Sequence, residues 1–375
     1  MVYHCHRMCL LVKYLVTGRS CLESASDYDY RASLSQTFTR SIAVSQSEQW
    51  TVKRLLEWTT DHFKKHGSDS PRLDAEILLA AALGCKRIDL YLRFNNEPGE
   101  AERTRFRESV KRRAAGEPVA YLVGYKEFYS LSFEVTRDTL IPRPETEHLV
   151  VEALDLLAKM GTPADSKQER PATPADSKQE RPATPADSKQ ERPCLHVCDV
   201  GTGSGAIAVA IAKNASQCRV TAVDLSPGAL EVARRNVVTH GVSDRVTLLI
   251  SDLLAEFPET PQFDLVVSNP PYVSEAEFAN LPPDVRNYEP KLALVAGEDA
   301  MTVIRNLAGQ SVSRLRNGGI QTRTPSNTGG WLLVELSPMI AGQVAEMLRQ
   351  QGWREVRILR DSTGQERIAV ACKPE

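Results

Sequence analysis

The feature that most constrains the fold of this chain is a glycine-rich loop between an apolar strand and a helix. Leu195–Val200 is a mainly apolar run with the length of a buried strand, and residues 206–212 open a helix. Between them, Gly201-Thr202-Gly203-Ser204-Gly205 lets the backbone turn tightly and lets a ligand approach the helix N-terminus. The G-x-G-x-G spacing differs from the G-x-G-x-x-G of dinucleotide sites and lacks the G-K-[ST] of a P-loop.

Strands and helices alternate along the rest of the chain. We predict further strands at residues 219–224, 246–251, 263–268 and 331–336. One helix begins at Ser226-Pro227 and another covers residues 298–315. This order predicts an α/β fold with a doubly wound, mostly parallel sheet. Residues 356–359 and 367–371 predict an antiparallel hairpin at the end of that sheet.

Four consecutive parts are expected. Residues 1–47 lack periodicity and predict a disordered extension, with a start site assigned too far upstream or a targeting segment as the alternatives. Residues 48–117 have helical apolar spacing and predict a small all-α domain suited to docking a substrate. Residues 118–143, with an alternating stretch at 128–135, predict a hairpin linker, and residues 144–375 predict the α/β domain.

Two insertions interrupt the α/β domain. Residues 162–193 repeat the sequence TPADSKQERP with a period of 11, and two prolines per copy exclude a helix. Each copy is charge-neutral and almost without apolar residues, so we predict a disordered, solvated loop. Residues 319–329 split what would be a tight turn before a strand. Since both insertions precede strands, we expect them at the amino edge of the sheet, away from the ligand site.

Composition excludes several classes of protein. The 46 Lys and Arg residues against 48 Asp and Glu give a net charge of −2, which argues against a dedicated nucleic-acid binder. No apolar run approaches the roughly 18 residues of a membrane span. The eight cysteines are scattered and form no disulfide framework, which indicates a reduced, cytoplasmic protein. We also expect no metal site.

Two carboxylates follow strands of the predicted sheet. Asp224 ends the strand after the glycine loop, where a carboxylate can accept both hydroxyls of a ribose. Asp252 follows the next strand, where it can contact an adenine or a ribose. Each acid taken singly could equally cap a helix or turn. Together with the glycine loop they fit S-adenosyl-L-methionine better than NAD, because this cofactor carries no pyrophosphate.

The fourth strand ends in an unusually rigid polar segment, Ser268-Asn269-Pro270-Pro271-Tyr272. The Asn269 amide oxygen and the Pro270 carbonyl can accept the two N–H bonds of a planar amide or amine, on which Tyr272 can stack. Such a nitrogen is a weak nucleophile because its lone pair is delocalised. The protein's contribution would be to aim it at an activated methyl carbon. The alternative interpretation is an ordinary Asn-Pro turn.

These motifs resemble those of the PrmC/HemK family, the peptide chain release factor glutamine N5-methyltransferases. The resemblance spans about residues 50–375 and rests on residues 70–79 (SPRLDAEILL), 116–124 (GEPVAYLVG), 140–147 (LIPRPETE), 199–208 (DVGTGSGAIA), 268–272 (SNPPY) and 288–290 (YEP). It implies a class I S-adenosylmethionine-dependent methyltransferase fold behind an N-terminal helical domain. It also implies methyl transfer to the side-chain amide of the glutamine in the release factors' Gly-Gly-Gln motif.

The resemblance assigns roles by position. Cofactor binding falls to Gly201, Thr202, Gly203, Ser204, Gly205, Asp224, Asp252, Leu253 and Asn269. Catalysis and substrate binding fall to Asn269, Pro270, Pro271 and Tyr272. Some members carry Trp at the position of Leu253, so only apolar packing is expected there, and Arg143 and Glu145 receive no chemical role. The expected partners are release factors, with no direct nucleic acid and no membrane, and the chain is expected to be a cytoplasmic monomer.

Two other functions stay open at this point. An N6-adenine DNA or rRNA base amino-methyltransferase could use the same NPPY clamp on an exocyclic amine, although such an enzyme usually has a basic groove or a target-recognition domain. A non-catalytic binding protein that keeps the fold is disfavoured by the intact glycine loop, Asp224 and NPPY segment.

Overall fold

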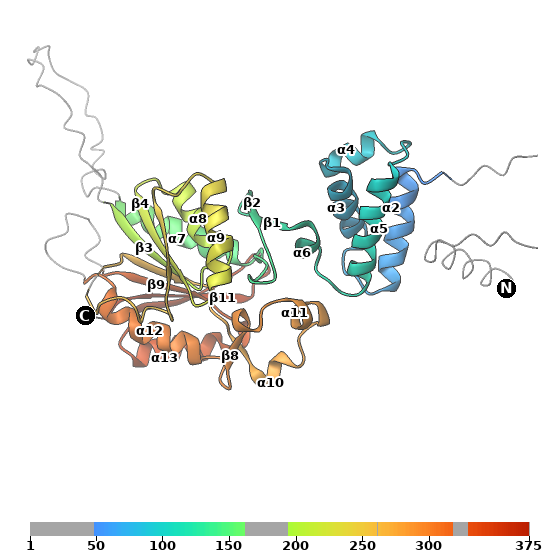
Figure 1. The fold of residues 1–375 in the computed structure, drawn as a ribbon. Coiled ribbons are helices and arrows are strands. Elements are labelled where there is room, and N and C mark those ends of the chain that lie inside the picture. The colour runs from blue at the N-terminus through green and yellow to red at the C-terminus, as the bar shows by residue number, and fades with distance from the viewer. Residues whose placement is uncertain (1–48, 162–193, 261, 318–328, 375) are drawn as a thin grey trace, which may run out of the picture. The chain divides into compact units, whose positions relative to one another are not determined.

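Parallel pairing of apolar strands builds the larger part of the molecule. A computed structural model describes residues 49–161, 194–260, 262–317 and 329–374 of the chain. The expected extension at 1–47, the repeat at 162–193 and nearly all of the insertion at 319–329 lie outside the described residues. The seven-stranded sheet has the order β10-β11-β9-β6-β3-β4-β5. Figure 1 labels β3, β4, β9 and β11 of this sheet. Its strands are β3 (Leu195–Val200), β4 (Cys218–Asp224), β5 (Val246–Ile250), β6 (Leu265–Ser268), β9 (Trp331–Glu335), β10 (Arg354–Arg360) and β11 (Glu366–Cys372).

Six strands run in one direction, and β11, between β9 and β10, runs in the opposite direction. β3 pairs in parallel with β4 on one side and β6 on the other, and β5 and β9 extend these pairs outward. β11 is antiparallel to both β9 and β10. The predicted doubly wound sheet with a terminal antiparallel hairpin is therefore confirmed.

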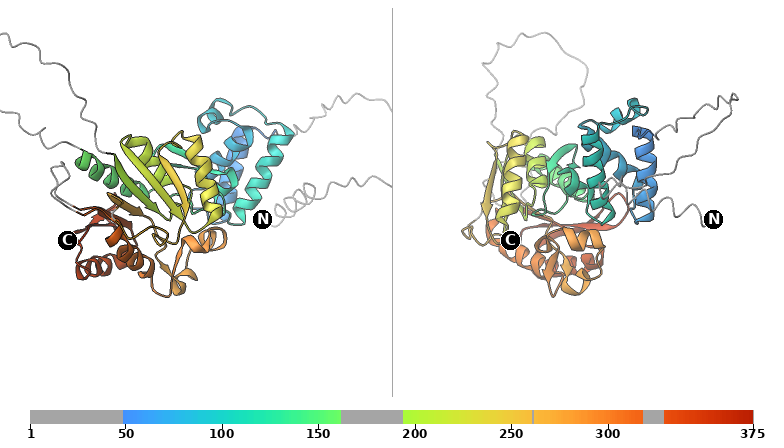
Figure 2. Two further views of the ribbon diagram at one scale, coloured as in Figure 1. Left: turned by 60° about the vertical axis from the view of Figure 1, so that its left-hand side comes forward. Right: turned by 45° about the vertical axis from the view of Figure 1, so that its right-hand side comes forward.

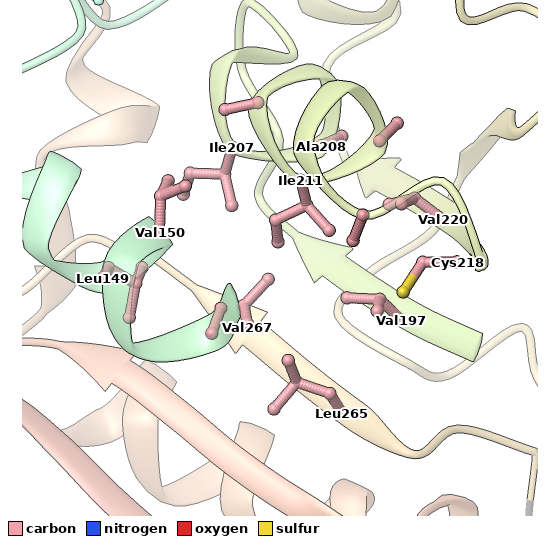
Figure 3. Close-up of a cluster of buried hydrophobic side chains, with 14 of the residues drawn as sticks. Leu149, Val150, Val197, Ile207, Ala208, Ile211, Cys218, Val220, Leu265 and Val267 are labelled. Atoms are coloured by element: carbon pink, nitrogen blue, oxygen red, sulfur yellow. The ribbon is translucent and has the colours of Figure 1, made fainter. Parts of the chain in front are cut away.

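Alternating side chains of the strands supply two separate cores, one on each face of the sheet. Leu265 and Val267 point to the face covered by α7 (Thr146–Gly161), α8 (Ala206–Asn214) and α9 (Pro227–Thr239) (Figure 3). Val266, between them, points to the face covered by α12 (Thr302–Arg314) and α13 (Ala341–Gln350). The result is a three-layer α/β/α arrangement, visible from two further directions in Figure 2.

The helical segment has a core of its own. It comprises α2 (Val52–Lys65), α3 (Pro71–Leu83), α4 (Arg87–Leu92), α5 (Glu100–Ala114) and α6 (Val119–Val123). Leu56, Phe63, Leu78, Leu79 and Leu90 are fully buried in it. α3 begins at Pro71 and ends at Gly84, which has φ +61°, as the sequence predicts.

The hairpin linker differs from the prediction in detail. Residues 128–135 are not one strand, because Tyr129 and Ser130 have φ values of 50° and 59° and form the turn between β1 (Tyr125–Phe128) and β2 (Leu131–Glu134). The apolar alternation continues through that turn, so periodicity alone does not reveal it. Phe128 and Phe133 pack edge to face on opposite strands, and both are buried.

Other boundaries also move. The strand expected from 263 begins at Leu265, and the helix expected from 298 begins at Thr302. α13 was not among the predicted helices. Short elements complete the chain: β7 (Val273–Ser274), α10 (Glu275–Phe278), α11 (Pro283–Tyr288), η2 (Lys291–Ala293), β8 (Val295–Gly297) and η3 (Pro338–Ile340). Across the described ranges, none of the helices has both the length and the apolar character needed to cross a bilayer.

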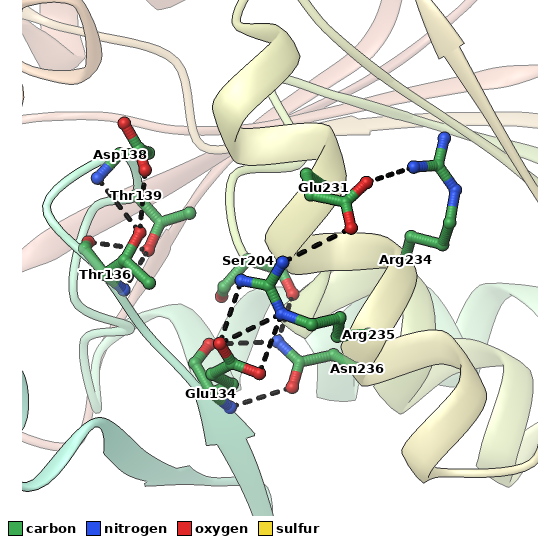
Figure 4. Close-up of polar contacts among 9 residues, drawn as sticks. All are labelled: Glu134, Thr136, Asp138, Thr139, Ser204, Glu231, Arg234, Arg235 and Asn236. Atoms are coloured by element: carbon green, nitrogen blue, oxygen red, sulfur yellow. Dashed lines mark hydrogen bonds and ion pairs between the residues drawn. The ribbon is translucent and has the colours of Figure 1, made fainter.

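Asn236 on α9 joins the hairpin to the glycine loop (Figure 4). Its Oδ1 accepts from the backbone N of Glu134 at 2.8 Å, and its Nδ2 donates to the carbonyls of Glu134 at 3.0 Å and Ser204 at 2.8 Å. The residue is fully buried, so these three backbone groups depend on one side chain.

Asn236→Ala should therefore lower the free energy of unfolding by about 2–4 kcal/mol, because it removes partners from three backbone groups. Arg235→Ala is the matched control on the next residue of α9. Arg235 pairs with Glu134, but both side chains are 41% exposed, so its loss should cost less than about 1 kcal/mol. Denaturant unfolding measures both variants, and equal losses would contradict the assignment.

The flanks of both insertions lie at the amino edge of the sheet, since one precedes β3 and the other precedes β9. Deletion of residues 162–193 should leave the methyl transfer implied by the resemblance near its wild-type rate. Deletion of the single copy 173–183 is the milder control. A large loss of turnover in a deletion variant that keeps the wild-type circular dichroism spectrum and melting temperature would overturn this placement.

Candidate active site

The carboxyl ends of β3, β4 and β6 open onto one cavity of about 350 Å³. Its walls include Gly201, Asp224, Leu253, Asn269 and Pro271. The chain leaves β3 toward β4 in one direction and later adds β6 on the other side of β3. Open α/β sheets bind ligands at such a reversal of strand order, in the crevice outside the carboxyl ends.

Three glycines shape the loop between β3 and α8. Gly201, Gly203 and Gly205 have φ values of 71°, 55° and 80°, which side chains rarely allow. A Cβ on Gly205 would also lie 3.2 Å from the Cβ of Ala233 on α9. The loop therefore needs glycine for backbone conformation and for close packing of α8 and α9, as well as for access to the cavity.

Asp199 supports the loop from beneath, a role that the sequence analysis missed. Its Oδ2 accepts from the Thr202 hydroxyl at 2.6 Å and from the backbone N of Ala208 at 3.1 Å. The carboxyl is completely buried, and burial raises its pKa to about 7. Thr202 and Ser204 are themselves buried, while Gly201, Thr202, Gly203 and Ser204 line the cavity.

Asp224 is held at the carboxyl end of β4 by two backbone donors. Gly203 N donates to its Oδ2 at 2.8 Å and Ser226 N donates to its Oδ1 at 2.9 Å. Burial raises the pKa of this carboxyl, and the two N–H donors act against that rise. The carboxylate lines the cavity in a fixed orientation, as binding of a ribose requires.

Asp252 and Leu253 line another part of the cavity wall. Asp252 is exposed, and Leu253 is half-buried with a φ of 54°, a strained value for a branched side chain. The backbone N of Leu254 is tied to Gln310 Oε1 at 2.8 Å, which helps hold this turn in place. Leu253 gives this part of the wall an apolar side chain.

The NPPY segment contributes unevenly to the cavity. Asn269 and Pro271 line it, whereas Pro270 is buried and Tyr272 packs against the apolar core under α12 and α13. Burial raises the pKa of Tyr272 to about 12, so its hydroxyl stays protonated at neutral pH. The Asn269 Nδ2 donates to the Thr146 hydroxyl at 3.1 Å.

Arg143 lies on the cavity wall and pairs with the buried Glu289 at 2.5 Å. The second oxygen of Glu289 accepts from Ile141 N at 3.3 Å. This ion pair joins the IPRPETE and YEP segments, which are separated by some 140 residues in sequence. Arg143 had no predicted chemical role, and its structural role is this link between two walls of the cavity.

Asp224 and Asp252 provide a direct test of the cofactor binding that the resemblance implies. Replacement of Asp224 by Ala should weaken binding of S-adenosylhomocysteine by about ten- to hundredfold, because the variant lacks the carboxylate that would accept hydrogen bonds from the ribose hydroxyls. Asp252→Ala should cost less, because Asp252 is exposed to water that competes for the same hydrogen bonds. Titration calorimetry measures both, and unchanged affinity in Asp224→Ala would refute the assignment.

Comparison with known sequence families finds two matches. Residues 54–124 match a family described as the PrmC N-terminal domain, and residues 188–281 match one described as the methyltransferase small domain. A solved methyltransferase from Pyrococcus furiosus is 16% identical, with a TM-score of 0.40 over 71% of this chain and 98% of that chain.

Similarity to individual proteins is stronger. A release factor glutamine methyltransferase of Rhodopirellula baltica is 48% identical over 326 residues, which is 86% of this chain and 97% of the relative. A release factor glutamine methyltransferase of Koribacter versatilis is 35% identical over 324 residues, 86% of this chain and 99% of the relative. This chain therefore belongs to the release factor glutamine methyltransferase family.

Proposed function

We propose that this protein transfers a methyl group from S-adenosyl-L-methionine to the side-chain amide nitrogen, N5, of the glutamine in the Gly-Gly-Gln motif of peptide chain release factors. The observation that carries the proposal is one cavity that is lined by both the glycine loop with Asp224 and the NPPY segment. The proposed binding place for the methyl donor would thus lie beside the proposed acceptors for the substrate amide.

The cavity fits the cofactor by its shape and donor set. Asp224 would hold the ribose hydroxyls, Leu253 and Asp252 would flank the adenine, and the glycine loop leaves room along its backbone. S-adenosylmethionine supplies a methyl group that is already activated on a sulfonium. The protein residues then need to bind and aim the substrate, without a strong base.

Asn269 and Pro270 would hold the substrate amide. The Asn269 side-chain oxygen and the Pro270 carbonyl would accept its two N–H bonds, and Pro271 would form part of the wall beside it. Tyr272 packs at the end of this segment and keeps it rigid. With both hydrogens held, the nitrogen can approach the methyl carbon in one orientation only.

The charges around the cavity favour a protein amide over a nucleic-acid base. Among the described residues that line it, the two cations are Arg137 and Arg143, and each is paired with a buried glutamate, Glu117 or Glu289. Phosphate binding requires cations that are free to pair with the backbone of the nucleic acid. We therefore propose release factors as partners, with no direct nucleic-acid binding, and a cytoplasmic monomer as the active form.

Methyl transfer from labelled cofactor to a purified release factor tests the substrate. We expect label on the glutamine of Gly-Gly-Gln, located by mass mapping of peptides. A release factor with Glu in place of that Gln offers no amide and should remain unlabelled. Label found only on DNA or RNA would support the base amino-methyltransferase instead.

Asn269→Ala tests the clamp. It should abolish turnover while the affinity for S-adenosylhomocysteine falls much less, because the lost interaction is mainly with the substrate amide. Asn280→Ala, at an exposed position outside the cavity, is the matched control and should keep full activity. Near-normal turnover in Asn269→Ala would contradict the clamp.

A further inference from the structure

We propose that Thr146 and Glu335 are positioning residues that fix the orientation of the Asn269 side-chain amide, so that its oxygen faces the substrate. The inference rests on the proposed function and deepens it, because it names what selects the productive orientation of the clamp. The two residues come from α7 and β9, far from the NPPY segment in sequence.

Strand register brings the three residues together. Ser268 pairs with Val334 in the parallel ladder of β6 and β9, so Asn269 and Glu335 leave their strands side by side. Leu333 contributes to the core under α7, and alternation places Glu335 on the same face. Thr146 is the first residue of α7 and is also buried.

The chemistry of the three side chains decides which group donates and which accepts in each of their hydrogen bonds. An ionised carboxylate only accepts, so the Thr146 hydroxyl must donate its hydrogen to Glu335, with which it is hydrogen-bonded. The oxygen of Thr146 can then only accept from the next group, which is the Asn269 Nδ2 at 3.1 Å. Since Nδ2 faces Thr146, Oδ1 of the same amide points away from it. That oxygen is the acceptor that the substrate amide requires.

The Glu335 carboxyl is withdrawn from water. Its side chain is 2% exposed, and within the described chain its Oε2 has no hydrogen-bond partner. A buried carboxyl with one unpartnered oxygen costs stability, and such groups occur where a functional arrangement requires them. The groups that face it are Tyr272 after β6, Arg367 on β11, and Arg143 and Glu145 before α7.

The chain of hydrogen bonds can reverse with pH. Burial raises the pKa of Glu335 to about 7. A protonated Glu335 donates to Thr146, whose hydroxyl can then donate to Asn269, and the amide turns its oxygen inward. Turnover should therefore rise between pH 6 and pH 8, by about tenfold for a single group that titrates near 7.

Thr146→Val removes the hydroxyl at nearly constant volume. We expect kcat for release factor methylation to fall about ten- to hundredfold, since the amide is no longer held in one orientation, while the affinity for S-adenosylhomocysteine changes much less. Thr146→Ser keeps the hydroxyl and should restore most of the kcat. Thr59→Val is the control, at a buried threonine of α2 whose hydroxyl has no partner in the described structure. Unchanged kcat in Thr146→Val would overturn the proposal.

Glu335→Gln separates positioning from structural support. The variant should lose the rise in kcat between pH 6 and pH 8. Its melting temperature should increase relative to wild type at pH 8, and less so at pH 5. The reason is that the pKa of Glu335 is higher in the folded than in the unfolded protein, so the wild type loses stability as the pH rises past the pKa of the unfolded state. A merely structural residue would lower stability and activity together. The double variant Thr146→Val/Glu335→Gln should be no less active than Thr146→Val alone.

A substrate-free measurement distinguishes the two proposals. The side-chain amide resonances of Asn269 in the NMR spectrum should shift between pH 6 and pH 8 in the wild type and stay fixed in Glu335→Gln. If they do so while no release factor is methylated, the proposed function fails and the orientation device stands. If release factors are methylated but neither substitution changes the Asn269 resonances or the pH profile of kcat, the proposal that Thr146 and Glu335 orient the Asn269 amide is wrong.

Discussion

The parallel pairing of β3 with both β4 and β6 is the constraint on which the rest of the site depends. In this register Val200 lies opposite Val223 on one side and Ser268 on the other, so three chain segments leave the sheet at the same level. The glycine loop, Asp224 and Asn269 then share one cavity without long-range adjustment. A Cβ on Gly201 would lie 4.0 Å from the Asn269 carbonyl oxygen, in ordinary van der Waals contact, so these two segments are direct neighbours.

Buried carboxylates are the recurring means of holding this site. Asp199 supports the glycine loop, Glu289 joins two walls through Arg143, and Glu335 stands behind Thr146. All three are buried, and burial raises the pKa of Asp199 and of Glu335 to about 7. These buried carboxylates lower the stability of the fold, but they fix the side chains around the cavity in which the substrate amide is proposed to be oriented.

The framework of the fold followed from periodicity and turn chemistry, whereas details that depend on contacts did not. The strand Leu195–Val200 and the Gly84 helix end agree with the predictions, because burial and glycine conformation act locally. The turn at Tyr129-Ser130 was missed since apolar alternation runs through it. The part played by Thr146 was hidden as well, because its partners come from other elements of the fold.

The sequence by itself determined the class of fold, the family and the motifs that are proposed to bind the two ligands, since glycine, proline and short apolar runs act through local backbone geometry. It also carried one unread signal, a glutamate at the end of the otherwise apolar strand WLLVE. Only the tertiary structure decided that Glu335 lies next to Thr146 and, through it, is linked to the Asn269 amide. That decision depends on the register of β6 against β9 and on where α7 begins, and both arise from packing of distant segments.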